Sequence, residues 1–155
     1  MTDDSKEYMF NSVVRWLRES NYIVSDEKHT IVTSEFFANI VSPENSAPSI
    51  ELVSAPSLGD GIMFQIRLAN LQERFEKLDT TGLKKDIENE KEIANELTEN
   101  RIFLSVSEKD LLLQKVYSPN PQIIESRNEI VDIVNALQYT SKNIMKWIHL
   151  NFKDK

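Results

Sequence analysis

The chain has 155 residues with no cysteine, two histidines and three glycines, and its formal net charge is −7. Without cysteine there can be no disulfide framework, no thiolate nucleophile and no cysteine-based zinc site, and three glycines are too few for a dinucleotide fingerprint or a phosphate-cradling loop. The acidic balance disfavours duplex nucleic acid as a partner. We therefore expect no cofactor, no metal and no nucleic acid.

The first half of the chain predicts one helix followed by strands. Over about residues 5–20, apolar side chains recur at the spacing of one helical face, namely Met9, Phe10, Val13, Trp16 and Leu17. β-branched and aromatic residues then predict strands over 22–24, 30–41 and 49–54, and we expect the polar run 25–28 to separate the first two. Residues 62–68 alternate strictly, which indicates a strand with one buried face.

The second half predicts helices around a hairpin. Residues 70–98 indicate helix in two pieces, with a break expected at 80–82. Residues 101–107 and 111–117 form a predicted hairpin, and a long helix is expected over about 121–152. That last helix carries two apolar stripes. The first comprises Ile123, Ile130, Val134, Leu137, Ile144 and Ile148, and the second comprises Ile124, Val131, Met145 and Phe152.

The order of elements predicts the fold class. Three or four strands follow the first helix and two more precede the last one, with short turns between most neighbours. Such runs favour an antiparallel sheet with helices, an α+β fold of order α-β-β-β-α-β-β-α with a long C-terminal helix. The length fits a single domain over residues 1–155.

Three segments resemble the type III secretion chaperone-like fold, which the bacterial YbjN family and archaeal proteins of about this length share. They are residues 16–22 (WLRESNY) at the end of the first helix, the alternating strand 62–68 (IMFQIRL), and the hairpin strand 113–117 (LQKVY) that leads into the last helix. The resemblance covers nearly the whole chain, but these are apolar patterns and not chemical signatures. It implies small acidic proteins that dimerise and bind other proteins, with no catalytic residues to carry over.

Candidate chemistry is sparse in this sequence. His29 and His149 stand apart, and His149 has no histidine or carboxylate three or four residues on. Because catalytic and metal sites need convergent groups, we expect both to be ordinary surface residues and the protein not to be an enzyme. Residues 79–100 hold seven carboxylates against three lysines, so they carry −4 of the net charge. That stretch is either a solvated face or an acidic surface for a basic partner.

Surplus apolar residues give the candidate binding positions. Phe36 and Phe37 are adjacent, so in a strand they point to opposite faces. The last helix has more apolar positions than one packed face needs. Either it is packed deeply on several sides, or part of it forms an interface. The candidate partner-binding residues are Phe37, Met145, Trp147 and Phe152, types enriched at interfaces.

These observations favour a non-catalytic protein-binding domain that is homodimeric and chaperone-like. The alternative is a small-molecule-binding regulatory domain, or an enzyme, with a pocket between sheet and helices. The start of the chain is acidic and polar, unlike a secretory signal, and the longest apolar runs have about three residues where a bilayer span needs about 20. We therefore expect a cytoplasmic protein that does not enter a membrane.

Overall fold

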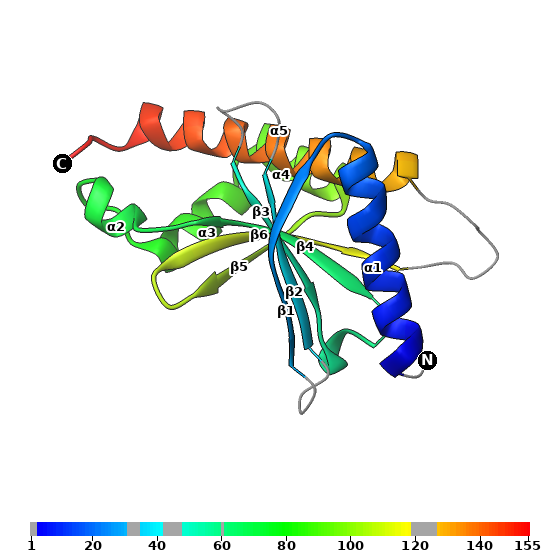
Figure 1. Cartoon of the computed structure of the whole chain (residues 1–155). Coiled ribbons are helices and arrows are strands. Elements are labelled where there is room, and N and C mark those ends of the chain that lie inside the picture. The colour runs from blue at the N-terminus through cyan, green and yellow to red at the C-terminus, as the bar shows by residue number, and fades with distance from the viewer. Residues whose placement is uncertain (1–2, 31–34, 42–47, 60, 119–126) are drawn as a thin grey trace. The chain divides into compact units, whose positions relative to one another are not determined.

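The computed structural model describes residues 3–30, 35–41, 48–59, 61–118 and 127–155, with side chains described outside 3–6 and 26–30. The predicted α+β class is confirmed (Figure 1). In chain order the described elements are α1 (Asp3–Glu19), β1 (Ile23–Thr30), β2 (Glu35–Val41), β3 (Ile50–Ser54), a 3-10 turn η1 (Pro56–Leu58), β4 (Ile62–Leu68), α2 (Leu71–Arg74), α3 (Thr80–Glu88), α4 (Lys91–Asn100), β5 (Phe103–Ser107), β6 (Asp110–Tyr117) and α5 (Arg127–Asn151).

Within the described ranges, six strands form one sheet in the order β1-β2-β3-β4-β6-β5. The pairs β1–β2, β2–β3, β3–β4 and β5–β6 are antiparallel, as the short turns between most of these strands predict. Four strands precede the central helices, the larger of the two numbers expected. The observed order therefore has one strand and two short helices more than α-β-β-β-α-β-β-α.

The chain packs as two compact units. One comprises residues 1–65 and 116–135, and the other comprises residues 66–115 and 136–155. The second unit holds α2, α3, α4, β5 and the C-terminal half of α5. The expectation of a single domain over 1–155 stays a prediction.

The first unit is built on an amphipathic α1. Val13 and Leu17 are fully buried, and the ring centroids of Phe10 and Phe36 lie 5.4 Å apart. The helix ends where Asn21 adopts a left-handed φ of 71° and the Tyr22 amide donates to the Leu17 carbonyl at 3.0 Å. Each large apolar side chain buried in this way contributes about 1.5–3 kcal/mol to folding.

The polar run 25–28 was wrongly expected to separate the first two strands. It lies inside β1, where the pairing with β2 shifts register between Ser25 and Lys28. Such a bulge lets a strand continue past extra residues. Because β1 is an edge strand that pairs with β2 alone among the described strands, polar residues are tolerated there. Of the predicted strand 30–41, only residues 35–41 form β2; Thr30 ends β1 and pairs with Glu35, and residues 31–34 lie outside the described part.

The expected break at 80–82 was also wrong. Thr80 begins α3, and the Asp79 carboxylate caps that helix by accepting a hydrogen bond from the Gly82 amide at 3.2 Å. The first predicted piece is helical only as α2, which ends at Arg74, so the break before α3 lies at 75–79. A second break, at Asn89 and Glu90, separates α3 from α4. The sequence misled because a glycine three residues after a capping aspartate occupies the first helical turn, where it supplies an amide and does not end the helix.

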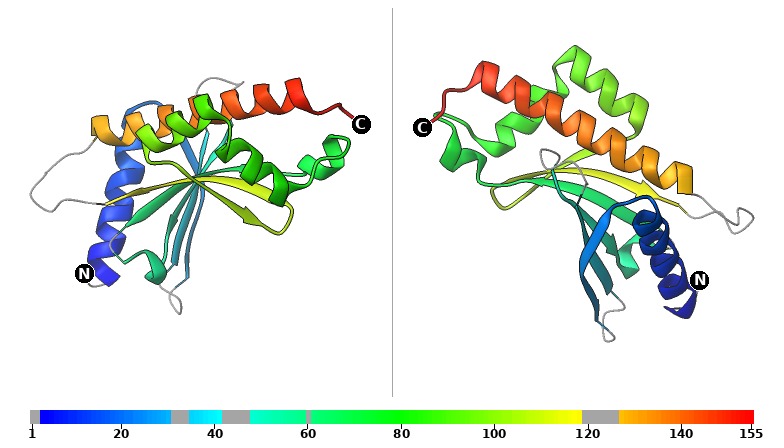
Figure 2. Two further views of the ribbon diagram at one scale, coloured as in Figure 1. Left: turned by 180° about the vertical axis from the view of Figure 1, so that it is seen from behind. Right: turned by 45° about the horizontal axis from the view of Figure 1, so that its top comes forward.

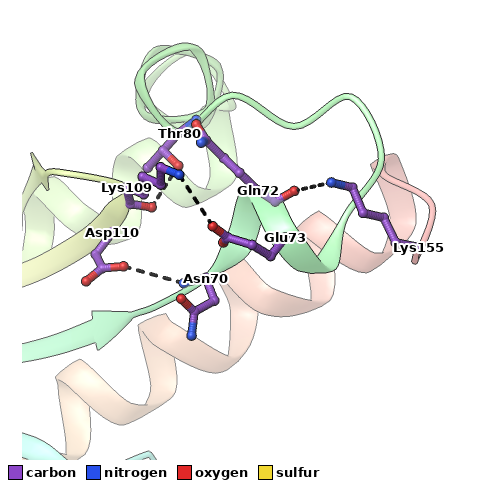
Figure 3. A network of polar contacts seen from close by, with 7 residues as sticks. All are labelled: Asn70, Gln72, Glu73, Thr80, Lys109, Asp110 and Lys155. Atoms are coloured by element: carbon purple, nitrogen blue, oxygen red, sulfur yellow. Dashed lines mark hydrogen bonds and ion pairs between the residues drawn. The ribbon is translucent and has the colours of Figure 1, made fainter.

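A polar network joins the start of α2, the start of α3 and the β5–β6 turn (Figure 3). The hydroxyl of Thr80, which is 1% exposed, donates to the Lys109 carbonyl at 3.0 Å, and the Thr80 amide donates to the Gln72 side chain at 3.0 Å. The Asp110 carboxylate accepts from the Asn70 amide at 3.4 Å and from Arg67 at 3.0 Å. These bonds fix the position of the start of α3.

The C-terminus is tied to the same region. The Glu76 amide donates to the Lys153 carbonyl at 2.8 Å, and the Lys155 amide donates to the Arg74 carbonyl at 2.9 Å. The Lys155 ammonium group also donates to the Gln72 carbonyl (Figure 3). The chain that follows α5 is therefore tied to the α2 region at both Lys153 and Lys155.

The two stripes predicted on α5 differ in burial. The described members of the first stripe are fully buried: Ile130, Val134, Leu137, Ile144 and Ile148. Val131, Met145 and Phe152 of the second stripe are only half-buried. Ile123 and Ile124 lie outside the described residues. The first stripe is thus the packed face of the helix, and the second borders it.

Alanine substitutions at two glycines are expected to change the free energy of unfolding in opposite directions. A Cβ on Gly61 would lie 2.7 Å from the Val116 side chain and 3.1 Å from the Leu58 carbonyl oxygen, whereas one on Gly82 would meet the nearest atom at 3.4 Å, an ordinary contact. We expect Gly61→Ala to lower the free energy of unfolding by about 1–3 kcal/mol, and Gly82→Ala to raise it by up to about 1 kcal/mol because α3 gains helix propensity. Urea unfolding followed by circular dichroism measures both, and equal signs would contradict the prediction.

Candidate functional site

The α4 and α5 helices are joined through one carboxylate. Glu96 of α4 accepts a hydrogen bond from the Thr140 hydroxyl at 2.8 Å and from the Asn143 amide at 3.0 Å. Thr140 is fully buried, and both donors lie on the C-terminal half of α5. Because a buried hydroxyl needs a partner, this contact fixes α4 beside α5, as both views of Figure 2 show.

Beyond this contact, α5 presents a second face to solvent. Tyr139 is 64% exposed and Leu150 is 76% exposed. They are eleven residues apart, which is about three helical turns, so they lie on the same side of α5. That side is distinct from the packed face. These two exposed side chains are therefore aligned along one face of α5.

These residues belong to a groove of about 430 Å³, called here the α4–α5 groove. Its first wall is formed by the start and outer side of α4 and consists of Glu90, Glu92, Ile93 and Glu96. Its second wall is formed by α5 and consists of Tyr139, Asn143, Lys146, Trp147 and Leu150.

A second depression, of about 400 Å³, adjoins the groove and is called the Trp147 recess. It shares Glu90 and Trp147 with the groove, and its further lining residues are Asp86, Asn89, Asn151 and Phe152. The rings of Trp147 and Phe152 meet edge to face with centroids 6.2 Å apart. Trp147 therefore stands between the two depressions, with an aromatic neighbour that fixes its orientation.

The groove and the recess are acidic. Together they are lined by four carboxylates, those of Asp86, Glu90, Glu92 and Glu96, and by one ammonium group, that of Lys146. In the described part of the chain, Asp86, Glu90 and Glu92 have no ion-pair partner within 4.0 Å, whereas Lys84 and Glu88 nearby are paired at 3.0 Å. The surface thus combines exposed apolar side chains with four carboxylates against one ammonium group, which is an excess of negative charge.

The structure brings together two of the four residues expected to bind a partner. Trp147 and Phe152 line the Trp147 recess. Met145 is half-buried on α5 and lines neither depression, and Phe37 is half-buried on β2 in the other unit. A binding role for each of these four residues stays a prediction. As expected, Phe36 and Phe37 face opposite sides of the strand, with Phe36 buried.

Sequence reasoning missed Tyr139 and Leu150. Each is flanked by polar residues, so neither belongs to a recognisable apolar stripe. The usable signal was their separation of eleven residues, which places them on one helical face. The acidic side of the groove was partly found, because Glu90, Glu92 and Glu96 belong to the acidic stretch 79–100.

The described residues offer little for catalysis. Among them, no three side chains of histidine, cysteine, aspartate or glutamate converge to hold a metal ion. The His149 Nδ1 atom lies 3.7 Å from an Asp154 carboxylate oxygen, a partner five residues on that the helical spacing did not suggest. The His149 ring also packs against Phe75 with centroids 5.1 Å apart. The side chain of His29 is outside the described residues. No helix in the described ranges combines the length and apolar character needed to cross a bilayer.

Comparison with known proteins identifies a likeness of fold alone. No protein-family model matches the chain, and no curated protein matches it in sequence. The crystal structure of an uncharacterised protein from Methanothermobacter thermautotrophicus is similar, with a TM-score of 0.63 and 13% sequence identity. The match covers 96% of this chain and 99% of that one. At this identity the similarity supports the α+β architecture and says nothing about activity.

The Glu96 contact predicts a measurable loss of stability. In Glu96→Ala the buried Thr140 hydroxyl and the Asn143 amide lose their acceptor, so we expect the free energy of unfolding to fall by about 1–3 kcal/mol. Glu99→Ala is the matched control, because Glu99 is an exposed residue of the same helix. Urea titration of both variants measures the difference, and equal stabilities would show that Glu96 does not hold the helices together.

Proposed function

We propose that this protein is a non-catalytic, homodimeric protein-binding domain of chaperone-like character, and that the α4–α5 groove is its binding surface. The observation that carries the proposal is the alignment of Tyr139, Trp147 and Leu150 along one groove between two helices. Aromatic and large apolar residues surrounded by polar ones are typical of protein interfaces.

The position of the groove favours protein binding over a small-molecule site or an enzyme. The alternative requires convergent polar groups in a pocket between sheet and helices. The groove and the recess are walled by α3, α4 and α5 and include no strand residue. Glu96 and Asn143, the most convergent polar pair there, already bond each other. This arrangement suits an elongated protein segment better than a small molecule.

The proposed setting is the cytoplasm, without a membrane or nucleic-acid partner. Small exported domains commonly rely on disulfides, and this chain has no cysteine. Its net charge of −7 opposes attraction to nucleic acid.

Self-association is proposed to use the edge strand β5. The strand reads Phe-Leu-Ser-Val-Ser, with no charge, proline or bulge, and Phe103 is 64% exposed. The opposite edge, β1, carries Asp26, Glu27 and Lys28 and a register shift. Charged residues and bulges are the common means of blocking edge-to-edge pairing. Only β1 is protected in this way, so β5 is the edge suited to a second copy.

The register of such pairing follows from the hairpin. Ser107 and Asp110 close a two-residue turn, so the backbone groups of Leu104 and Val106 point away from β6. Two copies meeting antiparallel about Ser105 would place each Leu104 opposite the partner's Val106. This register pairs the outward backbone groups of both residues, and the strand residues 103–107 that meet carry no charge.

The dimer proposal predicts that Phe103→Lys yields a monomer. The lysine places a charge on the pairing edge, as natural edge strands do. Because Phe103 is 64% exposed, folding itself should change little. Tyr8→Lys is the matched control, since Tyr8 is 68% exposed on α1. Sedimentation velocity over a wide concentration range is the measurement, and a wild-type chain that stays monomeric throughout would contradict the proposal.

The groove proposal predicts site-specific crosslinking to protein. A photoreactive benzoylphenylalanine at position 139, in the full chain expressed in its native cells, should crosslink to a discrete polypeptide after illumination. The same residue at position 8 serves as the control, because Tyr8 and Tyr139 are similarly exposed helical tyrosines. Crosslinking that is equal at both positions, or absent at 139, would contradict a role for the groove in protein binding.

A further inference from the structure

We infer that the occupant of the α4–α5 groove is a basic amphipathic helix of a partner protein. The inference rests on the proposed function and adds the chemistry of the partner. Its first support is charge, since Asp86, Glu90 and Glu92 have no ion-pair partner among the described residues. A groove that has both exposed apolar side chains and an excess of carboxylates attracts a segment that carries lysine or arginine beside apolar residues.

The walls of the groove select a helix over an extended strand. An extended peptide gains affinity by pairing its backbone with a free sheet edge. Both walls here are helices and offer no sheet edge; beyond the first turn of α4, their backbone groups are bonded within each helix. Such walls recognise a partner mainly through side chains, and an amphipathic helix presents its side chains on one face.

The anchors set the length of the bound helix. Tyr139 and Leu150 are eleven residues apart on α5, and they mark the two ends of the exposed apolar row. At about 1.5 Å per residue they are separated by roughly 16 Å along the helix axis. A partner helix of about three turns spans this distance, with Trp147 contacting its middle and last turns. Its basic residues then face Glu90 and Glu92 across the groove.

Lys146 is the one cation of the groove. It lies on the α5 wall, one residue before Trp147, while Glu90 and Glu92 lie on the α4 side. The field across the groove is therefore asymmetric. A bound helix is oriented by this asymmetry, with its basic side toward α4.

Two synthetic peptides test the inference. The basic peptide has fourteen residues with leucines on one helical face and lysines beside them, and the acidic peptide has glutamate at every lysine position. Isothermal titration of the full chain should detect binding of the basic peptide and at least tenfold weaker binding of the acidic one. Intrinsic fluorescence reports the location, because the chain has two tryptophans and Trp16 is 5% exposed in the core. The emission change on binding should disappear in Trp147→Phe.

Charge-reversed variants separate local recognition from net attraction. Glu90→Lys with Glu92→Lys should weaken binding of the basic peptide about tenfold more than Glu129→Lys with Asp132→Lys, which changes the net charge equally at exposed positions outside the groove. Circular dichroism confirms that both variants fold. Equal weakening in the two variants, equal affinity for the two peptides, or no binding of the basic peptide would each overturn the inference.

These experiments distinguish failure of this inference from failure of the proposed function. If position 139 crosslinks to a polypeptide whose captured segment is not basic, protein binding stands and the basic helix is wrong. A change in Trp147 emission with protein concentration alone would assign the groove to a second copy of this chain, and would also overturn the inference.

Discussion

The carboxylate of Glu96 determines where α4 lies, because it accepts hydrogen bonds from the fully buried Thr140 hydroxyl and from Asn143 on α5. A buried donor without an acceptor is costly, so α4 cannot move away from α5 without breaking these bonds. These hydrogen bonds hold α4 beside α5, and the α4–α5 groove lies between the two helices. The α4 side of the groove is acidic and its α5 side is aromatic and apolar.

Contacts outside α4 and α5 fix the segment before α4 and the segment after α5. The network at Thr80 fixes the start of α3, and the backbone bonds of Glu76 and Lys155 tie down the chain after α5. In both sets of contacts the polar groups bond one another. The proposed function rests instead on two surfaces of the described residues: the α4–α5 groove, with its excess of negative charge, and the uncharged sheet edge β5.

Much of the fold followed from local patterns. The helical spacing of α1, the alternation of β4 and the fully buried stripe of α5 each reflect a single packed face, which periodicity reports directly. The errors arose where context outweighed local preference. A polar run stayed in β1 because an edge strand tolerates it, and Gly82 entered a helix because Asp79 uses its amide as a cap. The separation of α3 from α4 at Asn89 had no strong local signal.

The sequence by itself determined the α+β class, the absence of cysteine chemistry and the concentration of negative charge in residues 79–100. It also marked Trp147 and Phe152 as unusual, because α5 has more apolar residues than one packed face requires. Only the tertiary structure decided that Tyr139, Trp147 and Leu150 share a groove with Glu90 and Glu92. These residues come from helices about 50 positions apart in the chain, joined by side-chain hydrogen bonds between Glu96, Thr140 and Asn143 that no pattern in the sequence encodes. Periodicity describes which face of a helix is apolar, whereas the neighbour of that face depends on long-range packing.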